Sequence, residues 1–178
     1  YKKIKLLIKK NYLSSKINDE NMSFVFSLSR LLKIKDKRFI SSMKTFIGLP
    51  HRYEIFLKKK NITFINDSKA TSFQATNLAL AFSKNIFWIV GGRPKKNDKI
   101  NLNNVKNNII KSYIIGKHTN FFKKRLKNKI KFSITKNLKN SIISIIKDSK
   151  SFRNVNTTIL LSPAAASFDQ FKNFENRG

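Results

Sequence analysis

Apolar residues recur with a helical spacing in the first part of this chain. Within residues 21–32 they fall on one face of a helix and predict a helix that begins near Asn18 or Asp19. Residues 37–46 predict a second, shorter helix. In residues 1–13 lysine alternates with isoleucine and leucine, a pattern that fits either a strand pair or a basic surface segment.

After a break at Gly48-Leu49-Pro50, short apolar runs alternate with helical patterns. The run Ile86-Phe87-Trp88-Ile89-Val90 contains no polar position, which is typical of a strand buried on both faces of a sheet. Strands are predicted at residues 53–57, 62–65, 86–90, 113–116, 131–134 and 157–161, the fifth of them at an edge. Helices are predicted at residues 73–82, 102–110, 121–126, 138–146 and 168–176. The alternation predicts an α/β fold, a mostly parallel sheet with helices on both faces, after a short helical segment.

Three of the predicted buried strands run directly into polar or glycine-rich segments, at residues 66–71, 91–98 and 162–169. Because the carboxyl ends of parallel strands share one edge of a sheet, we expect these segments to converge on one site. The first places a carboxylate, an ammonium and two hydroxyls close together, which favours a ligand site. The alternative is a turn in which Asp67 or Ser68 caps the next helix.

The other two segments carry chemistry suited to an anion. Gly91-Gly92 allows the backbone to approach a ligand closely, and Lys95 or Lys96 then offers a positive charge. Residues 162–167 are small, so that backbone N–H groups and the Ser167 hydroxyl could meet an anion at a helix start. The alternatives are a solvated glycine turn and close packing by alanines.

Composition narrows the function classes. The net charge is +29, but the lysines are spread along the whole chain, which favours a solvated basic surface over a nucleic-acid site. The chain has no cysteine and only two histidines, which excludes thiolate chemistry and a histidine-rich metal site. His51, beside the break, is interpreted as an ordinary boundary residue. The five glycines form no triphosphate-binding loop, and no apolar run is long enough to span a membrane, so a cytoplasmic protein is expected.

Together, these segments resemble the Mur ligases, and within that family the ligases that add D-glutamate to UDP-N-acetylmuramoyl-L-alanine. The resemblance extends from about residue 18 to residue 178, and its last stretch is long and highly specific. The stretches that carry it are Gly48-Leu49-Pro50-His51-Arg52, Asn66-Asp67-Ser68-Lys69-Ala70-Thr71, Gly91-Gly92 with Lys95, and Leu161-Ser162-Pro163-Ala164-Ala165-Ala166-Ser167-Phe168-Asp169-Gln170-Phe171-Lys172-Asn173-Phe174-Glu175-Asn176-Arg177-Gly178.

The resemblance implies a domain organisation. Mur ligases have an N-terminal domain for the uridine nucleotide, a central ATPase domain and a C-terminal dinucleotide-binding-like domain. Residues 1–47 would be the end of the central domain, and residues 48–178 the C-terminal domain with its last helix truncated. The uridine-binding domain, the phosphate loop and the magnesium ligands would lie upstream, so the chain alone is expected to be inactive.

The resemblance also implies a reaction and a role for particular residues. The carboxylate of UDP-N-acetylmuramoyl-L-alanine takes the γ-phosphoryl group of ATP, and the amine of D-glutamate attacks the resulting acyl phosphate. Lys69 would lie near the reacting groups as the catalytic residue. The D-glutamate ligands would be Thr71, Lys95, Ser167 and the backbone around Phe174. The ATP contacts would be Asn18 and Asn21 near the adenine, Arg52 at the phosphates and Asp67 at the sugar, with no metal ligand in this chain.

Two other functions fit parts of the pattern. A ligase of the same superfamily with another amino acid, such as a folylpolyglutamate synthase, shares the general plan. A basic nucleic-acid-binding module would account for the net charge of +29.

Overall fold

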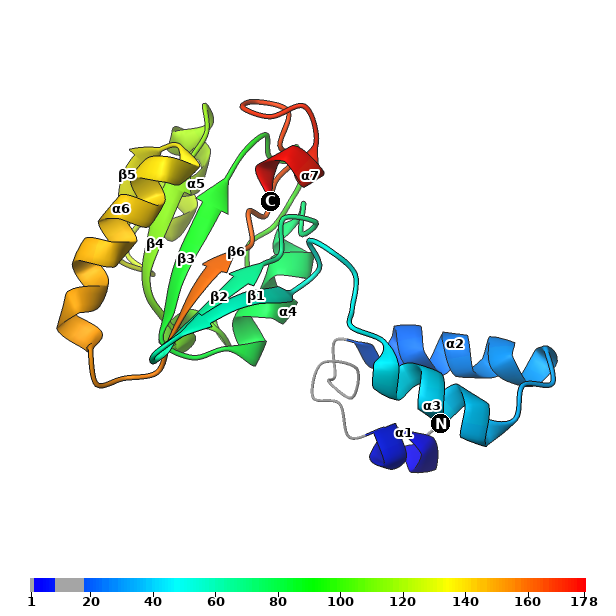
Figure 1. The fold of residues 1–178 in the computed structure, drawn as a ribbon. Helices are drawn as coiled ribbons and strands as arrows, with labels where there is room; N and C mark the ends of the chain where they lie inside the picture. Colours follow the sequence, from blue (N-terminus) through cyan, green and yellow to red (C-terminus); the bar gives the residue numbers. More distant parts are fainter. Residues whose placement is uncertain (1, 9–17) are drawn as a thin grey trace. The chain divides into compact units, whose positions relative to one another are not determined.

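The computed structural model describes residues 2–8 and 18–178, and the chain divides between Leu49 and Pro50 into two compact units (Figure 1). The described residues of the first unit form three α-helices, α1 (Lys2–Ile8), α2 (Asp19–Leu31) and α3 (Asp36–Thr45). Their common core consists of Ile8, Met22 and Phe39, with Ile4, Phe26, Ile34 and Met43 packed against it.

The described part of residues 1–13 is therefore helical, so no strand pair forms over residues 2–8. Lys2 and Lys3 of this helix are exposed, as in the alternative of a basic surface segment. Ile4 and Ile8 lie one helical turn apart and both pack on the core. Between them, Leu6 and Leu7 are exposed, and Lys5 forms an ion pair with Asp19 at the start of α2. Residues 9–13 lie outside the described part of the chain. Asn18 occupies the N-cap position of α2, but its side chain makes no capping hydrogen bond.

The second unit is built on a six-stranded sheet in the order β1-β2-β6-β3-β4-β5 (Figure 1). β1 and β2 pair antiparallel, and every other neighbouring pair is parallel. The predicted mostly parallel α/β sheet is confirmed, with β5 at one edge. The strands are β1 (Glu54–Lys59), β2 (Ile62–Asn66), β3 (Ile86–Gly91), β4 (Ile109–Ile115), β5 (Phe132–Lys136) and β6 (Thr157–Leu161).

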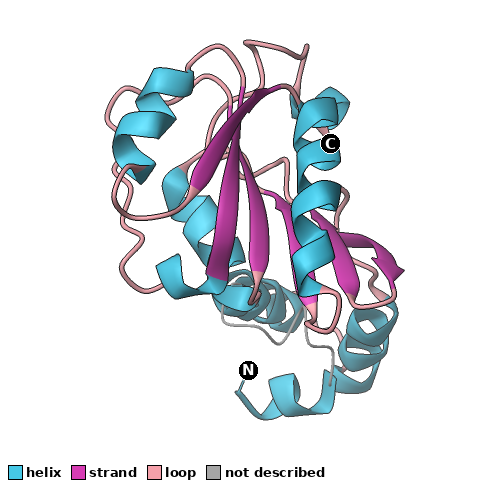
Figure 2. Ribbon diagram, turned by 90° about the vertical axis from the view of Figure 1, so that its left-hand side faces the viewer, coloured by secondary structure: helices cyan, strands magenta, loops and turns pink. Residues whose placement is uncertain are grey.

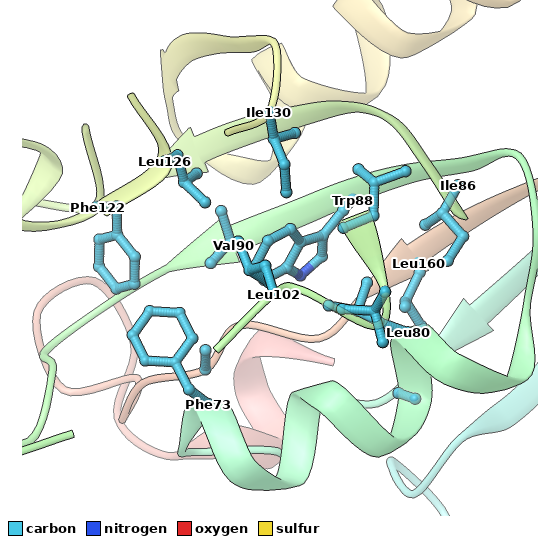
Figure 3. Packing of buried hydrophobic residues seen from close by; sticks show 14 of the residues in the cluster. Phe73, Leu80, Ile86, Trp88, Val90, Leu102, Phe122, Leu126, Ile130 and Leu160 are labelled. Carbon is cyan, nitrogen blue, oxygen red and sulfur yellow. The ribbon is translucent and has the colours of Figure 1, made fainter. Parts of the chain in front are cut away.

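Helices cover both faces of this sheet, and the alternation of side chains along β3 explains how (Figure 2). Trp88 lies in the cluster on the face of α4 (Phe73–Phe82) and α5 (Thr119–Leu126), as Figure 3 shows. Phe87 lies in the opposite cluster, which includes Ile145 of α6 (Leu138–Ser149). Because β3 is buried on both faces, all six of its residues are buried, as its apolar sequence predicts.

Residues 102–110 do not form the predicted helix. They form a loop with a short 3-10 turn at Lys106–Asn108, and β4 already begins at Ile109. Leu102 and Val105 are buried three residues apart, so their spacing satisfies the core without a helix. The Asn108 side chain donates a hydrogen bond to the backbone of α4 at Leu80, which holds the loop against that helix.

The predicted helix over residues 168–176 is also wrong for most of its length. Only α7 (Phe174–Arg177) is helical, and Asn173 caps it. The preceding residues are held by tertiary contacts instead: the Asp169 carboxylate accepts the Lys117 N–H at 2.8 Å, and the Gln170 amide donates to the Lys136 carbonyl at 2.9 Å. These anchors direct the segment across the ends of the strands.

The other predicted elements of both units are confirmed, with ends that differ by a few residues. No helix among the residues that the structure describes is long and apolar enough to cross a membrane.

Candidate functional site

The three polar segments predicted to converge do meet at the carboxyl ends of adjacent strands. β2, β6 and β3 are neighbours in the sheet. Backbone hydrogen bonds join the segments that follow them: Asp67 N–H donates to Leu161 O at 2.8 Å, and Gly91 N–H donates to Pro163 O at 2.9 Å. Arg93 and Ala166 exchange two further backbone hydrogen bonds. The site therefore has a continuous backbone frame.

Gly91 and Gly92 are required by this frame. A Cβ atom on Gly91 would lie 2.1 Å from the carbonyl oxygen of Ile115, and one on Gly92 would lie 2.3 Å from that of Ala166. Both residues also have positive φ angles, which side chains disfavour. The sequence analysis predicted that the backbone of Gly91 and Gly92 lies close to a ligand. In the structure, this backbone lies close to the backbone of Ile115 and Ala166.

Asp67 is a buried carboxylate at the centre of the site. Its Oδ2 accepts a hydrogen bond from Ser162 Oγ at 2.7 Å, and its Oδ1 accepts the Tyr53 N–H at 3.1 Å. Burial raises the pKa of Asp67 to about 6, against the two hydrogen bonds and the charge of Arg52, which lower it. The two hydrogen bonds fix the position of this carboxylate.

Neither Asp67 nor Ser68 caps α4, which corrects one predicted alternative. Ser72 is the N-cap, and its side chain accepts the Ala75 N–H at 3.3 Å. Ser68 is instead fully buried, and its hydroxyl donates to the Phe174 carbonyl at 2.8 Å. The segment after β2 is thus fixed to α7, more than a hundred residues later in the chain.

Arg177 is a functional candidate that the sequence did not single out. It is 2% exposed, and its guanidinium donates to Ser68 Oγ, Ser68 O and Ala165 O at 2.8–3.0 Å. Burial lowers its pKa to about 10, while the charge of Asp169 raises it, so the group stays charged at neutral pH. The missing Cβ of Gly92 leaves room for it, since that atom would lie 3.1 Å from Arg177 Nη1. Arg177 therefore joins the segments after β2 and β6 through α7.

Asp169 is a second residue that the sequence did not single out. Its carboxylate lies against Gly116, where a Cβ would be 2.2 Å from Asp169 Oδ2. It accepts the N–H of the next residue, Lys117, so the end of β4 is joined to the same segment. Only the glycine after the apolar run of β4 could have suggested this contact from the sequence.

Lys69 follows Ser68 and is exposed. Its backbone N–H donates to the His51 carbonyl at 3.0 Å. Its Nζ lies 3.8 Å from the centre of the Phe174 ring, which His51 also contacts edge-on. His51 is thus more than a boundary residue, because its ring, 2.9 Å from the Asn66 amide, packs within the site.

The predicted D-glutamate ligands lie around this frame. Thr71 is half-buried just before the N-cap of α4, and Ser167 is 3% exposed. The sequence predicted that Ser167 lies at the start of a helix, and this prediction is wrong. The Ser167 carbonyl instead accepts the N–H groups of Gln170 and Phe171 in turns. Phe174 begins α7.

Lys95 and Lys96 are both exposed. The Lys95 carbonyl accepts the Asp98 N–H at 3.3 Å, and the Asp98 carboxylate accepts the Phe73 N–H at 2.8 Å. The loop that carries the two lysines is thereby attached to the start of α4.

The predicted ATP contacts are divided between the two units. Arg52 is exposed and Asp67 is buried, and their charges interact in the second unit. Asn18 and Asn21 lie at the start of α2, in the first unit. No group of three or more His, Asp or Glu side chains that could hold a metal ion occurs within residues 2–8 and 18–178.

No family model matches the chain. Among curated proteins, it is 39% identical over 161 residues, or 90% of its length, to the UDP-N-acetylmuramoylalanine--D-glutamate ligase of Wolbachia sp. subsp. Brugia malayi. The ligases of the same name from Bartonella henselae and Rickettsia felis are 36% and 34% identical over 90% and 98% of the chain. The chain spans about a third of the length of these curated relatives: 32%, 34% and 38%. The resemblance predicted from the motifs is confirmed by these relatives.

Proposed function

We propose that this chain is the C-terminal part of an ATP-dependent ligase that joins D-glutamate to UDP-N-acetylmuramoyl-L-alanine, a step in peptidoglycan precursor synthesis. The proposal rests above all on residues 161–178, the most specific stretch of the resemblance, which lie against residues 66–71 at the carboxyl ends of β2 and β6. Relatives that match at least 90% of the chain carry the name of this activity. A reaction that uses ATP and a nucleotide-linked precursor places the protein in the cytoplasm.

In this proposal, residues 48–178 are the C-terminal domain and residues 1–47 the end of the central domain. The parts of the protein that precede this chain then contain the phosphate loop, and they bind the uridine nucleotide and provide most of the magnesium coordination. The role of residues 48–178 is to bring the amino acid and to close over ATP.

The reaction proceeds in two steps. An oxygen of the substrate carboxylate attacks the γ-phosphorus of ATP, and ADP leaves. The amine nitrogen of D-glutamate then attacks the acyl carbon, loses a proton, and inorganic phosphate leaves as the amide forms. Such steps depend chiefly on positioning and on stabilisation of negative charge.

D-glutamate is a dicarboxylate and needs fixed cations and hydrogen-bond donors. Lys95 provides a charge on a loop anchored at α4. The Thr71 and Ser167 hydroxyls and the backbone at Phe174 provide donors around the frame. The Ser68 hydroxyl and Arg177 hold that backbone in place.

A different set of residues contacts ATP. Arg52 binds its phosphates, and Asn18 and Asn21 lie near its adenine. Asp67 receives a ribose hydroxyl, since each of its oxygens accepts one hydrogen bond from the protein and keeps a second lone pair. Lys69 stabilises the negative charge that develops on the transferred phosphoryl and acyl groups.

Amino-acid selectivity in the full-length protein tests this function. With UDP-N-acetylmuramoyl-L-alanine and ATP, D-glutamate should release phosphate and add one glutamyl residue to the nucleotide, as measured by mass spectrometry. L-glutamate in the same assay is the matched control. A protein that prefers L-glutamate and a folate acceptor would instead be a folylpolyglutamate synthase.

A further inference from the structure

The ammonium group of Lys69 is held by an aromatic ring. Its Nζ lies 3.8 Å from the centre of the Phe174 ring, within the range of a cation–π interaction. Lys69 is exposed and forms no ion pair with any carboxylate of the described residues. The ring of a residue 105 positions later is therefore its principal partner in this part of the chain.

The ring itself has a fixed position. The His51 ring meets it edge-on, with 6.0 Å between centroids and 82° between planes. The Phe174 carbonyl accepts the Ser68 hydroxyl at 2.8 Å, and Asn173 caps the helix that begins at Phe174. The Lys69 N–H is bonded to the His51 carbonyl, so both partners stand on an anchored backbone.

A ring holds a lysine differently from a carboxylate. A carboxylate would neutralise the ammonium, whereas the ring attracts it through its quadrupole and leaves its net charge intact. The contact also restricts a long side chain, so that less rotamer entropy is lost when a ligand binds. An anion that reaches this edge of the sheet therefore meets an oriented cation that is not already neutralised.

We propose that the Phe174 side chain is a positioning residue for Lys69: its ring orients the ammonium toward the phosphoryl group transferred at this site. This inference rests on the proposed function. It gives the Phe174 ring a role separate from that of its backbone at D-glutamate, because every substitution at this position keeps the backbone.

The contact can be measured directly in the full-length protein. Reductive methylation with ¹³C-formaldehyde labels the lysines, and the signal that disappears in Lys69→Arg is that of Lys69. The wild-type signal should show an upfield ring-current shift, which Phe174→Leu removes and Phe174→Tyr keeps. Phe168→Leu, at an exposed phenylalanine (67%) of the same segment, should keep it as well.

Kinetics then test the role. We expect Phe174→Leu to lower kcat about fivefold, the scale of one exposed cation–π contact, with little change in the KM for D-glutamate. Phe174→Tyr, which keeps the aromatic face, should recover most of the kcat that Phe174→Leu loses, and Phe168→Leu should retain wild-type kcat. A merely structural role would instead lower the thermal unfolding midpoint of Phe174→Leu and affect both kinetic parameters.

The possible failures are distinct. Absence of D-glutamate-dependent phosphate release in the wild type would overturn the proposed function. With that activity present, a wild-type Lys69 signal without a ring-current shift would overturn the inference, whether or not Phe174→Leu folds. Equal losses of kcat in Phe174→Leu and Phe174→Tyr would also overturn it.

Discussion

Asp67 and Arg177 are charged side chains that are almost completely buried, and hydrogen bonds hold both of them. Arg177 donates hydrogen bonds to protein oxygens, and these replace the hydrogen bonds to water that a guanidinium loses on burial. Lys69 and Lys95, by contrast, are exposed. At the scale of single residues, the buried charges organise the strand ends, and the exposed ones are the groups that the proposed function assigns to ligands.

Replacing Lys95 with alanine tests its assignment to D-glutamate. Removal of one partner of a desolvated charge pair should cost about 2–5 kcal/mol, so kcat/KM for D-glutamate should fall at least about 30-fold. The KM for ATP should change much less in steady-state assays of the full-length protein. Lys96→Ala is the matched control, and a larger loss in that variant would mean that Lys96 faces the ligand instead.

Asp67→Asn should change how stability depends on pH. Because burial raises the pKa of Asp67 from 3.8 to about 6, the folded protein binds more protons than the unfolded chain between these values. The contribution of Asp67 to the free energy of unfolding is thus complete below about pH 4 and falls by about 3 kcal/mol as the pH rises to about 7.

Asparagine can keep both hydrogen bonds, since it can accept from Tyr53 and donate to Ser162, but it does not titrate. In denaturant titrations, the free energy of unfolding of Asp67→Asn should therefore increase relative to that of the wild type as the pH rises. A constant difference across this range would contradict the raised pKa.

At the scale of elements, the caps and turns decide where helices begin. α4 begins after Ser72 and α6 after Asn137, and both side chains accept a backbone N–H of the first turn. The predicted helix over residues 168–176 is reduced to α7, because Asp169 and Gln170 bond to other segments. Local pattern alone does not contain these competing partners.

The capping hydrogen bonds of α4 and α6 differ in length, which predicts that the loss of one cap destabilises the protein more than the loss of the other. The Ser72 bond is 3.3 Å long and the Asn137 bond is 2.8 Å. Asn137→Ala should cost about 1 kcal/mol of unfolding free energy and Ser72→Ala about half of that. Urea titrations measure both, with Ser151→Ala at an exposed position as the control. A larger cost for Ser72→Ala would reverse the order expected from the bond lengths.

At the scale of the whole molecule, the sheet order brings together segments that are far apart in the chain. β6 lies between β2 and β3, so residues that follow position 161 meet those that follow positions 66 and 91. The described residues nonetheless contain no metal-binding cluster, and the five glycines of the sequence form no phosphate loop. Under the proposed function, they hold only part of the ligase site.

The chain alone should therefore be inactive as a ligase. A phosphate-release assay with ATP, UDP-N-acetylmuramoyl-L-alanine and D-glutamate should show no D-glutamate-dependent signal. The full-length protein under identical conditions is the positive control. Release of phosphate by the isolated chain would show that it carries a complete site.

The net charge of +29 leads to a second prediction at this scale. A spread of lysines attracts any polyanion, so binding to a labelled DNA duplex should be weak, independent of sequence and abolished at moderate salt. A nucleic-acid-binding module would instead bind tightly and distinguish between sequences. Fluorescence anisotropy over a salt series with two unrelated duplexes separates these outcomes.

The sequence by itself determined the α/β class, most of the elements and the three polar segments after buried strands. These follow from the periodicity of apolar residues and from local turn chemistry, which act over a few residues. The helix predicted over residues 102–110 failed because Leu102 and Val105 satisfy a core formed by other elements.

Only the tertiary structure decided how the polar side chains are used. Ser68 could cap a helix as well as bind α7, and nothing local separates these choices. Arg177, Asp169 and the ring of Phe174 act on residues that are 50 to more than 100 positions away in the chain. Such contacts depend on the order of strands in the sheet, which is set by packing of the whole domain rather than by any one segment.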